Sequence, residues 1–203
     1  MKSQSLLTIA LTILSAPLLA QTKPVPEPTT PPARVFHDPR TGINFQVPAG
    51  WDLSRRDHEV SSFNQDARST TRTTQLRAVA NITFNPLPQT TFSGALFYAS
   101  LTPHLTDADC ARQVSAKNPR PAATTQIAGI PFTHGYDEHG GVCIESRDEI
   151  YTALHNGSCY RFDLVVNNFC GGEVSGVRDM NERQLDAIRK RLEAILMTVQ
   201  FDK

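Results

Sequence analysis

The stretch from His134 to Cys143, HGYDEHGGVC, holds the residue types in this chain that could most readily do chemistry. Two histidines flank a pair of carboxylates, and imidazole nitrogens with carboxylate oxygens are ligands that zinc and similar ions accept. An ion held there would activate water for hydrolysis. His134, Asp137 and His139 are therefore the candidate metal ligands, and a metal-dependent or other hydrolase is one candidate function.

A simpler interpretation of the same stretch is a polar, solvated hairpin loop. Gly135, Gly140 and Gly141 are typical of a turn, and the two histidines lack the helical spacing of many zinc sites. We adopt this interpretation, so the sequence predicts no catalytic residue, no metal site and no cofactor.

Sequence motifs of nucleophilic catalysis do not occur in the chain. The patterns G-x-S-x-G, S-x-x-K and C-x-x-C are all missing. Asp148 and Glu149 are adjacent carboxylates, but neighbours in a strand point to opposite faces and do not converge on one site. The sequence therefore favours a protein that is not an enzyme.

The first 20 residues have the pattern of a secretory signal peptide. Lys2 supplies a positive charge, and the apolar run Leu6–Ala20 is shorter than the about 20 residues that a membrane-spanning helix needs. Gln21 stands where a lipoprotein signal would have cysteine. We expect a secreted or periplasmic protein with no membrane span and no lipid anchor after removal of residues 1–20.

The next segment, residues 21–34, is a proline-rich linker with the sequence QTKPVPEPTTPPAR. Its five prolines remove amide donors and favour extended backbone, so we expect a tether with little internal structure. Residues 35–203 then form a single folded domain of ordinary size.

The charge of the chain is balanced, with 20 Lys and Arg against 20 Asp and Glu. Because no basic stripe is present to neutralise phosphates, we expect no nucleic-acid partner. The prediction is a monomer whose partner, a protein or a small molecule, is unknown.

The four cysteines, Cys110, Cys143, Cys159 and Cys170, suggest two disulfides in an exported chain. Asn156-Gly157 favours a two-residue type I′ turn, in which His155 faces Ser158. Continued along both strands, this register brings Cys143 opposite Cys170. Cys159 lies roughly 36 Å from Cys170 along the same strand, too far for a bridge. The predicted bridges are therefore Cys143–Cys170 and Cys110–Cys159.

Two features of this register count against it. A strict ladder makes Cys143 and Cys170 a hydrogen-bonded pair, whose side chains are farther apart than a disulfide prefers. It also puts Arg147 and Glu149 on the face that carries Phe162. A three-residue loop would shift the pairing by one residue, and this alternative stays open.

The remaining pattern predicts further strands and two helices. Trp51, after Pro48 and Gly50, is interpreted as an anchor that seals the edge of a sheet rather than as a ligand contact. Residues 57–75 are a polar loop. Thr106 is a candidate N-cap for a first helix, and an amphipathic helix over about 179–197 would cover a sheet. The predicted strands lie at 34–38, 42–47, 76–84, 95–101, 124–141, the hairpin strands on either side of 156–157, and 198–201.

The order of these elements resembles PsbP-like domains. The segments that carry the resemblance are DPRTGINFQVPAGW, IAGIPFTHGY, EIYTALHNGSCYRFDLVV and RLEAILMTVQF, and they span most of residues 35–203. The resemblance implies an α+β fold, with an antiparallel β-sheet covered by helices in an α/β/α sandwich. It also implies an accessory or binding module, without a shared catalytic residue set.

Taken together, the sequence favours an exported, non-enzymatic binding or accessory module of unknown ligand. The alternatives are a hydrolase that uses the 134–139 loop and a structural protein of the cell envelope. Convergence of the 134–139 side chains in a cleft would favour the hydrolase.

Overall fold

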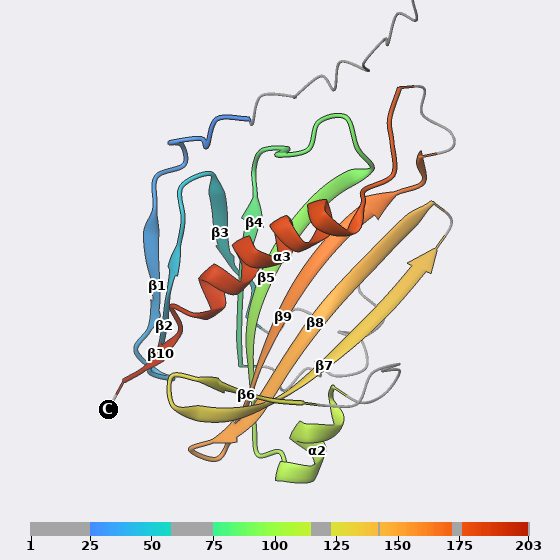
Figure 1. Ribbon diagram of the computed structural model, residues 1–203. Helices are drawn as coiled ribbons and strands as arrows, with labels where there is room; N and C mark the ends of the chain where they lie inside the picture. Colours follow the sequence, from blue (N-terminus) through green and yellow to red (C-terminus); the bar gives the residue numbers. More distant parts are fainter. Residues whose placement is uncertain (1–24, 58–74, 115–122, 142, 172–175, 203) are drawn as a thin grey trace, which may run out of the picture.

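The computed structural model describes residues 25–57, 75–114, 123–141, 143–171 and 176–202. The predicted signal segment and nearly all of the polar loop at 57–75 lie outside these residues. Within them the chain is mostly antiparallel β-sheet (Figure 1).

The main element is a seven-stranded sheet in which every adjacent pair is antiparallel. In spatial order its strands are β3 (Trp51–Arg55), β4 (Leu76–Ile82), β5 (Phe92–Pro103), β9 (Ser158–Phe169), β8 (Ile144–His155), β7 (Ile130–Gly141) and β6 (Ala123–Ile127). A small sheet has the order β1 (Arg34–Asp38), β2 (Ile43–Val47) and β10 (Gln200–Phe201).

The helix α3 (Glu182–Leu196) crosses one face of the large sheet diagonally (Figure 1). Asn181 and Gln184 form a capping box at its start, which satisfies amides that the first turn leaves open. Its apolar side packs against β5 and β9 and reaches β2 of the small sheet. We call this side of the large sheet the helix face and the other side the far face.

The core lies between the helix face, α3 and the small sheet. Phe97 and Phe162 stack at 5.9 Å between ring centroids, and Phe45 of the small sheet meets Phe97 edge to face at 5.2 Å. Such contacts add specific geometry to the burial of apolar area. The aromatic chain therefore fixes the small sheet against the large one.

Trp51 is a packing residue, as the sequence indicates. It begins the edge strand β3, is 2% exposed and belongs to the main core. Its carbonyl accepts a hydrogen bond from Arg34 at 3.2 Å.

The predicted register of the central hairpin is confirmed. Asn156 and Gly157 both have positive φ, as a type I′ turn requires, and His155 faces Ser158. The alternative register with Ile150 beside Phe162 is wrong, because Tyr151 is the partner of Phe162.

The predicted Cys110–Cys159 bridge is present, with its Cα atoms 5.6 Å apart. It ties α2 (Asp107–Arg112), capped by Thr106 as expected, to the start of β9. This short helix packs on β8 and β9.

The second predicted bridge is not formed: Cys143 and Cys170 are not joined by a disulfide. The ladder ends one step short of them, at the pair Ile144 and Phe169. Cys143 has a φ of 60° in the turn before β8, so it does not continue the strand and does not take the position that the extended ladder requires.

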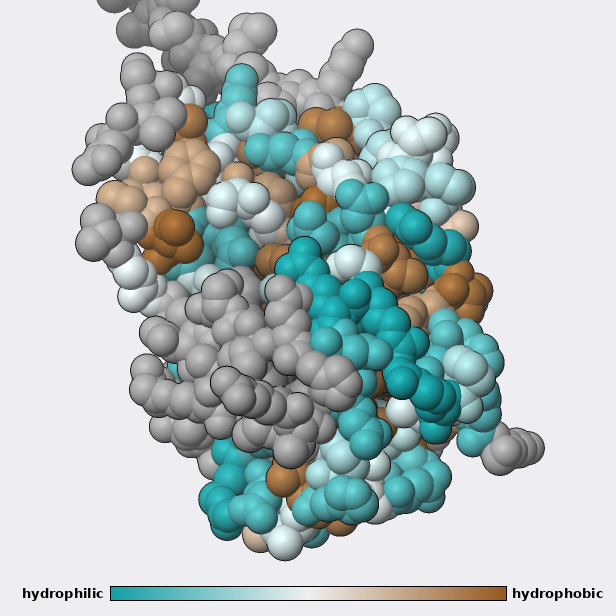
Figure 2. All heavy atoms as spheres, turned by 180° about the vertical axis from the view of Figure 1, so that it is seen from behind, coloured by the Kyte–Doolittle hydropathy of each residue, from teal (hydrophilic) through white to brown (hydrophobic). Residues whose placement is uncertain are grey.

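The expectation of an antiparallel sheet with helices is correct, but the full sandwich stays a prediction. One face of the large sheet carries both α3 and the small sheet. On the far face, the described residues supply only the six-residue α2 as a helix. Seen from that side, the described surface is mostly hydrophilic, and its hydrophobic side chains lie in separate groups (Figure 2).

The end of the proline-rich segment lies against the domain instead of standing apart from it. Residues 25–33, which we call the strap, have no regular secondary structure. The amide of Gly50 donates to the carbonyl of Pro31 at 2.9 Å, and Glu27 pairs with Arg191 of α3. The packed part of the chain thus begins before residue 35.

No helix among the described residues is both long and apolar enough to cross a membrane.

The two cysteine pairs give a direct stability test. Replacing both Cys110 and Cys159 with Ala is expected to lower the free energy of unfolding by about 4 kcal/mol, because the bridge closes a loop of 49 residues. The matched control, Cys143→Ser with Cys170→Ser, is expected to change it by less than about 1 kcal/mol. Urea denaturation measures both. An equal loss in the two variants would show that a second bridge exists.

Candidate functional site

His134 and Asp137, the candidate metal ligands whose side chains are described, do not converge. They lie on the strand β7 and not on a loop, and strand alternation turns His134 to the helix face and Asp137 to the far face. The side chain of His139 is outside the described residues. Among the side chains that are described, no group of three or more His, Cys, Asp or Glu could hold a metal ion.

His134 instead takes part in a row of polar contacts on the helix face, which we call the polar ladder. Its Nε2 lies 2.8 Å from Oε2 of Glu149, and its ring stacks on Tyr151 with centroids 4.2 Å apart. The other oxygen of Glu149 lies 3.5 Å from Nε of Arg189 on α3. Glu149 therefore links the strand β8 to both β7 and the helix.

The polar ladder continues toward the tip of the β7–β8 hairpin. Tyr136 donates its hydroxyl to Glu138 at 2.9 Å, and Arg147 donates to the other oxygen of Glu138 at 3.2 Å. Arg147 also pairs with Glu145 at 3.5 Å. The residues face one another because Tyr136 is the cross-strand partner of Glu149, and Glu138 of Arg147.

The polar ladder binds the helix to the sheet where apolar packing stops. The guanidinium of Arg189 lies over the ring of Tyr136, 5.7 Å from its centroid, within the range of cation–π attraction. The carboxylates of Glu138 and Glu149 are each shared by two partners. This arrangement is structural, since every polar group named in it already has a partner.

Burial changes the ionisation of the tyrosines in this row. Removal from water raises the pKa of Tyr136 to about 12, and its hydrogen bond to Glu138 acts in the same direction. Burial also raises the pKa of Tyr151, with the charge of Glu149 adding to the effect.

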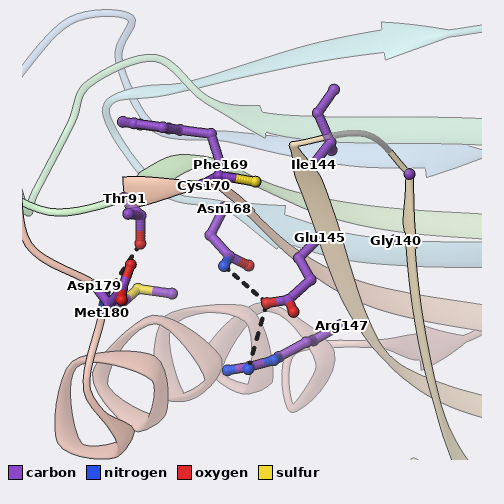
Figure 3. Close-up of a pocket in the computed structure, with 11 residues that line it drawn as sticks. Thr91, Gly140, Ile144, Glu145, Arg147, Asn168, Phe169, Cys170, Asp179 and Met180 are labelled. Carbon is purple, nitrogen blue, oxygen red and sulfur yellow. Dashed lines mark hydrogen bonds and ion pairs between the residues drawn. The ribbon is translucent and has the colours of Figure 1, made fainter. Parts of the chain in front are cut away.

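The polar ladder ends at a cavity of about 410 Å³, which we call the end pocket (Figure 3). Its walls come from the tip of the β7–β8 hairpin, the end of β9 and the segment before α3. The lining residues are Thr91, Gly140, Gly141, Ile144, Glu145, Arg147, Asn168, Phe169, Cys170, Asp179 and Met180. Its volume falls in the range of about 300–1,000 Å³ that small-molecule sites occupy.

The far wall of the end pocket is fixed by backbone hydrogen bonds. The amide of Phe169 donates to the carbonyl of Thr91 at 2.9 Å, and Thr91 in turn donates to the carbonyl of Arg178 at 2.9 Å. The amide of Met180 donates to the hydroxyl of Thr91 at 3.1 Å. Thr91, itself fully buried, thus holds β9 and the segment before α3 at a set separation.

Asn168 gives the end pocket an acceptor that the described residues leave unmatched. Its Nδ2 donates to Oε2 of Glu145 at 2.9 Å. Since a carboxylate only accepts, this contact fixes which end of the amide faces Glu145. The buried Oδ1 then has no hydrogen-bond partner within the described part of the chain.

Negatively charged side chains outnumber positively charged ones around the end pocket. Glu145 and Asp179 line it, and Glu138 contacts Arg147, which is the one cation among the described lining residues. Phe169, Met180 and the 60% exposed Ile144 supply an apolar side. Three carboxylates against one guanidinium, beside an unmatched acceptor, favour a ligand that donates hydrogen bonds and carries an apolar part.

The register predicted from the sequence contains a signal for this site. Arg147 and Glu149 fall on the same face as Phe162 in the correct register, which conflicts with a purely apolar core. Polar residues at alternating positions toward one end of a core-facing strand indicate a polar network or a pocket edge. Asn168 and Thr91 carry no such pattern, because their roles depend on contacts far apart in the chain.

The far face has buried charges of its own. Arg161 donates from Nε to both carboxylate oxygens of Asp163, at 2.8 and 2.9 Å, and both side chains are nearly inaccessible to water. A pair of this kind is matched internally and anchors packing.

Removing the charge of Glu149 tests the polar ladder. Glu149→Gln is expected to lower the free energy of unfolding by about 1–3 kcal/mol, because His134 and Arg189 lose a buried carboxylate. Asp186, the other acidic partner of Arg189, is 58% exposed, so Asp186→Asn should cost less than about 0.5 kcal/mol. Chemical denaturation of both variants provides the comparison, and equal losses would contradict a special role for Glu149.

Alkaline titration tests the environment of Tyr136. Its folded-state pKa of about 12 lies above the ordinary value of 10.0, so the neutral phenol stabilises the fold below pH 10. That contribution is lost as the pH rises through about 12. The measurement is the difference in phenolate absorbance between the native chain and Tyr136→Phe. A Tyr136 transition near pH 10 in folded protein would be incompatible with this burial.

Comparison with known proteins bears on the fold. No family model and no curated protein matches the chain. Among solved structures, a protein from Bacteroides thetaiotaomicron is similar with 12% identity and a TM-score of 0.50, covering 84% of this chain and 48% of that one. The chain therefore spans about half the length of that protein.

Two further solved structures are similar over most of their own length. Cyanobacterial PsbP (CyanoP) from Synechocystis has 11% identity and a TM-score of 0.49, covering 84% of this chain and 92% of that one. LpqN of Mycobacterium tuberculosis, described as involved in cell envelope biogenesis, has 12% identity and a TM-score of 0.43, with 84% and 91% covered. A PsbP protein is thus among the solved structures to which the chain is similar, at 11% identity.

Proposed function

We propose that the protein is an exported, non-enzymatic binding or accessory module, and that its end pocket receives the ligand. The observation that carries this proposal is the buried Oδ1 of Asn168, an acceptor with no donor among the residues described. A buried acceptor without a partner costs about 1–3 kcal/mol, and a bound donor would remove that cost.

The form of the cavity supports binding rather than turnover. Binding pockets combine an apolar lining with a few polar groups that fix orientation, and the end pocket has both. Its carboxylates Glu145 and Asp179 favour a cationic or amide donor. Phe169 and Met180 offer an apolar surface to the rest of the same ligand.

Export is supported by the chemistry of the chain. The Cys110–Cys159 bridge is of the kind that persists in oxidising compartments. Residues 1–20 have the pattern of a signal peptide. We therefore place the mature protein outside the cytoplasm, as a secreted or periplasmic protein.

The two alternatives gain no specific support from the geometry. A hydrolase at 134–139 would need His134 and Asp137 on one side of the sheet, and β7 turns them to opposite faces. His134 is also engaged by Glu149 and Tyr151. A purely structural role in the envelope gives no reason for a hollow with an unmatched acceptor.

A small probe tests the proposal in the full chain. Leucinamide carries an ammonium group, an amide and an apolar side chain, and its size predicts a Kd of about 1 mM or weaker. Isotope-edited NMR titration should show saturable shifts that cluster at Glu145, Asn168 and Met180. N-acetylleucine, whose amine is acylated and which ends in a carboxylate, should give none.

A pair of variants locates the binding. Glu145→Gln removes a charge from the pocket and is expected to weaken leucinamide binding several-fold. Glu182→Gln changes an exposed acid at the start of α3 and should leave binding unchanged. If leucinamide gives no saturable shifts, or binds both variants equally, the end pocket is not the ligand site.

A further inference from the structure

The strap is attached to the domain at three neighbouring points. Glu27 receives two hydrogen bonds from the guanidinium of Arg191, at 2.8 and 2.5 Å, and this contact lowers the pKa of Glu27. Pro28 lies against Gly50, and the carbonyl of Pro31 accepts from the amide of Gly50. In Figure 1 the strap is the blue segment that leads into β1.

The surface beneath the strap has the shape of a slot for a proline ring. A Cβ placed on Gly50 would lie 2.4 Å from Cγ of Pro28 and 3.1 Å from the ring of Phe84. Any side chain at residue 50 would therefore fill the slot. The guanidinium of Arg191 lies over the same Phe84 ring, 5.8 Å from its centroid, so a cation borders the slot.

The contacts that attach the strap to this surface are few and weak. Glu27 is 60% exposed and Arg191 33% exposed, and an ion pair this open to water contributes little to stability. Only Pro28 and Pro31 of the strap are partly buried. With one backbone hydrogen bond besides, the attachment is of the kind that another segment can replace.

Next to the slot is a cavity of about 560 Å³ with a second cation. It is bounded by Val25 and Glu27 of the strap, the segment 86–90, and the side chains of Arg178, Gln184 and Arg191. Two guanidinium groups thus face one carboxylate. The surface has room and charge for a longer acidic segment than the strap supplies.

We propose that the strap is an intramolecular occupant of a groove that also binds an extended segment of a partner protein. The groove comprises Gly50, Phe84, Arg191 and the adjoining cavity. Its ligand carries a carboxylate directly before a proline and a second proline three residues later, as in Glu27-Pro28-Thr29-Thr30-Pro31. Proline-rich segments suit such a site because they are extended before they bind.

The strap acts as a competitor in this arrangement. A tethered segment has an effective concentration of about 1 mM or more, so a free segment binds wild-type protein with reduced apparent affinity. A partner gains access when it presents its segment at comparable local concentration. Release of the strap from the groove should therefore raise the apparent affinity of the groove for the partner's segment.

A labelled synthetic peptide of residues 22–34 tests the proposal by fluorescence anisotropy with the full chain. Glu27→Lys in the protein removes its own strap contact and leaves the groove intact. The native peptide is expected to bind this variant at least about 10-fold more tightly than it binds the wild type. A peptide that carries Glu27→Lys should not bind.

Matched variants separate groove from fold, each made in the Glu27→Lys protein. Arg191→Ala should abolish peptide binding, whereas Arg183→Ala, an exposed site on the same helix, should not. Gly50→Ala should also abolish it by filling the slot. Gly129→Ala controls for backbone strain, since Gly129 shares a φ of +79° but has open space around it.

Three results would overturn the proposal. The first is absence of peptide binding to the Glu27→Lys protein. The second is equal binding of a proline-free acidic peptide, which would show a general anion surface. The third is concentration-dependent dimerisation of the wild type that is lost in Glu27→Lys, which would make a second copy of this chain the occupant.

Discussion

The pairing of β8 with β9 is the constraint on which the rest of the structure depends. The turn at Asn156-Gly157 needs positive φ at both positions, and it sets every later pair along two strands of twelve residues. With Tyr151 opposite Phe162, the core side chains of both strands fall on the helix face. The same pairing places Cys159 next to α2, where it forms the disulfide with Cys110.

The register also decides where charge is placed. It brings Arg147 and Glu149 to the edge of an apolar face, where they are stable only because β7 and α3 supply partners. At the far end it aligns Glu145 with Asn168, which orients the amide and leaves its buried oxygen without a hydrogen-bond partner among the described residues. The register set at the turn therefore determines which polar groups line the end pocket, about ten residues away along both strands.

The two proposed sites share a wall but differ in kind. The end pocket is acidic and enclosed by strand ends, whereas the groove under the strap is basic and bordered by Phe84. Thr90 and Arg178 pair as an isolated bridge beside both, and their neighbours Thr91 and Asp179 line the end pocket. A binding module with one site for a small donor and another for an extended segment is compatible with an accessory role.

The structural elements that depend only on residues close in sequence were predicted correctly. The Asn-Gly turn, the Thr106 cap, the end of β2 before Pro48 and the final helix follow from residues close in sequence. Gly135, Gly140 and Gly141 favour a turn at the 134–139 stretch, but its pairing with β8 makes it a strand. The Cys143–Cys170 bridge is not formed because Cys143 has a positive φ and does not continue the strand. No sequence pattern predicts this backbone conformation. The strap and the end pocket each include contacts between residues far apart in the chain, such as Glu27 with Arg191 and Met180 with Thr91, and periodicity does not indicate these contacts.

Cross-strand nuclear Overhauser contacts in the full chain test the central pairing most directly. The account predicts contacts that place Tyr151 opposite Phe162 and Glu145 opposite Asn168. Contacts that place Ile150 opposite Phe162 would contradict it, since that shift would turn Glu145, Arg147 and Glu149 away from α3 and dissolve the end pocket.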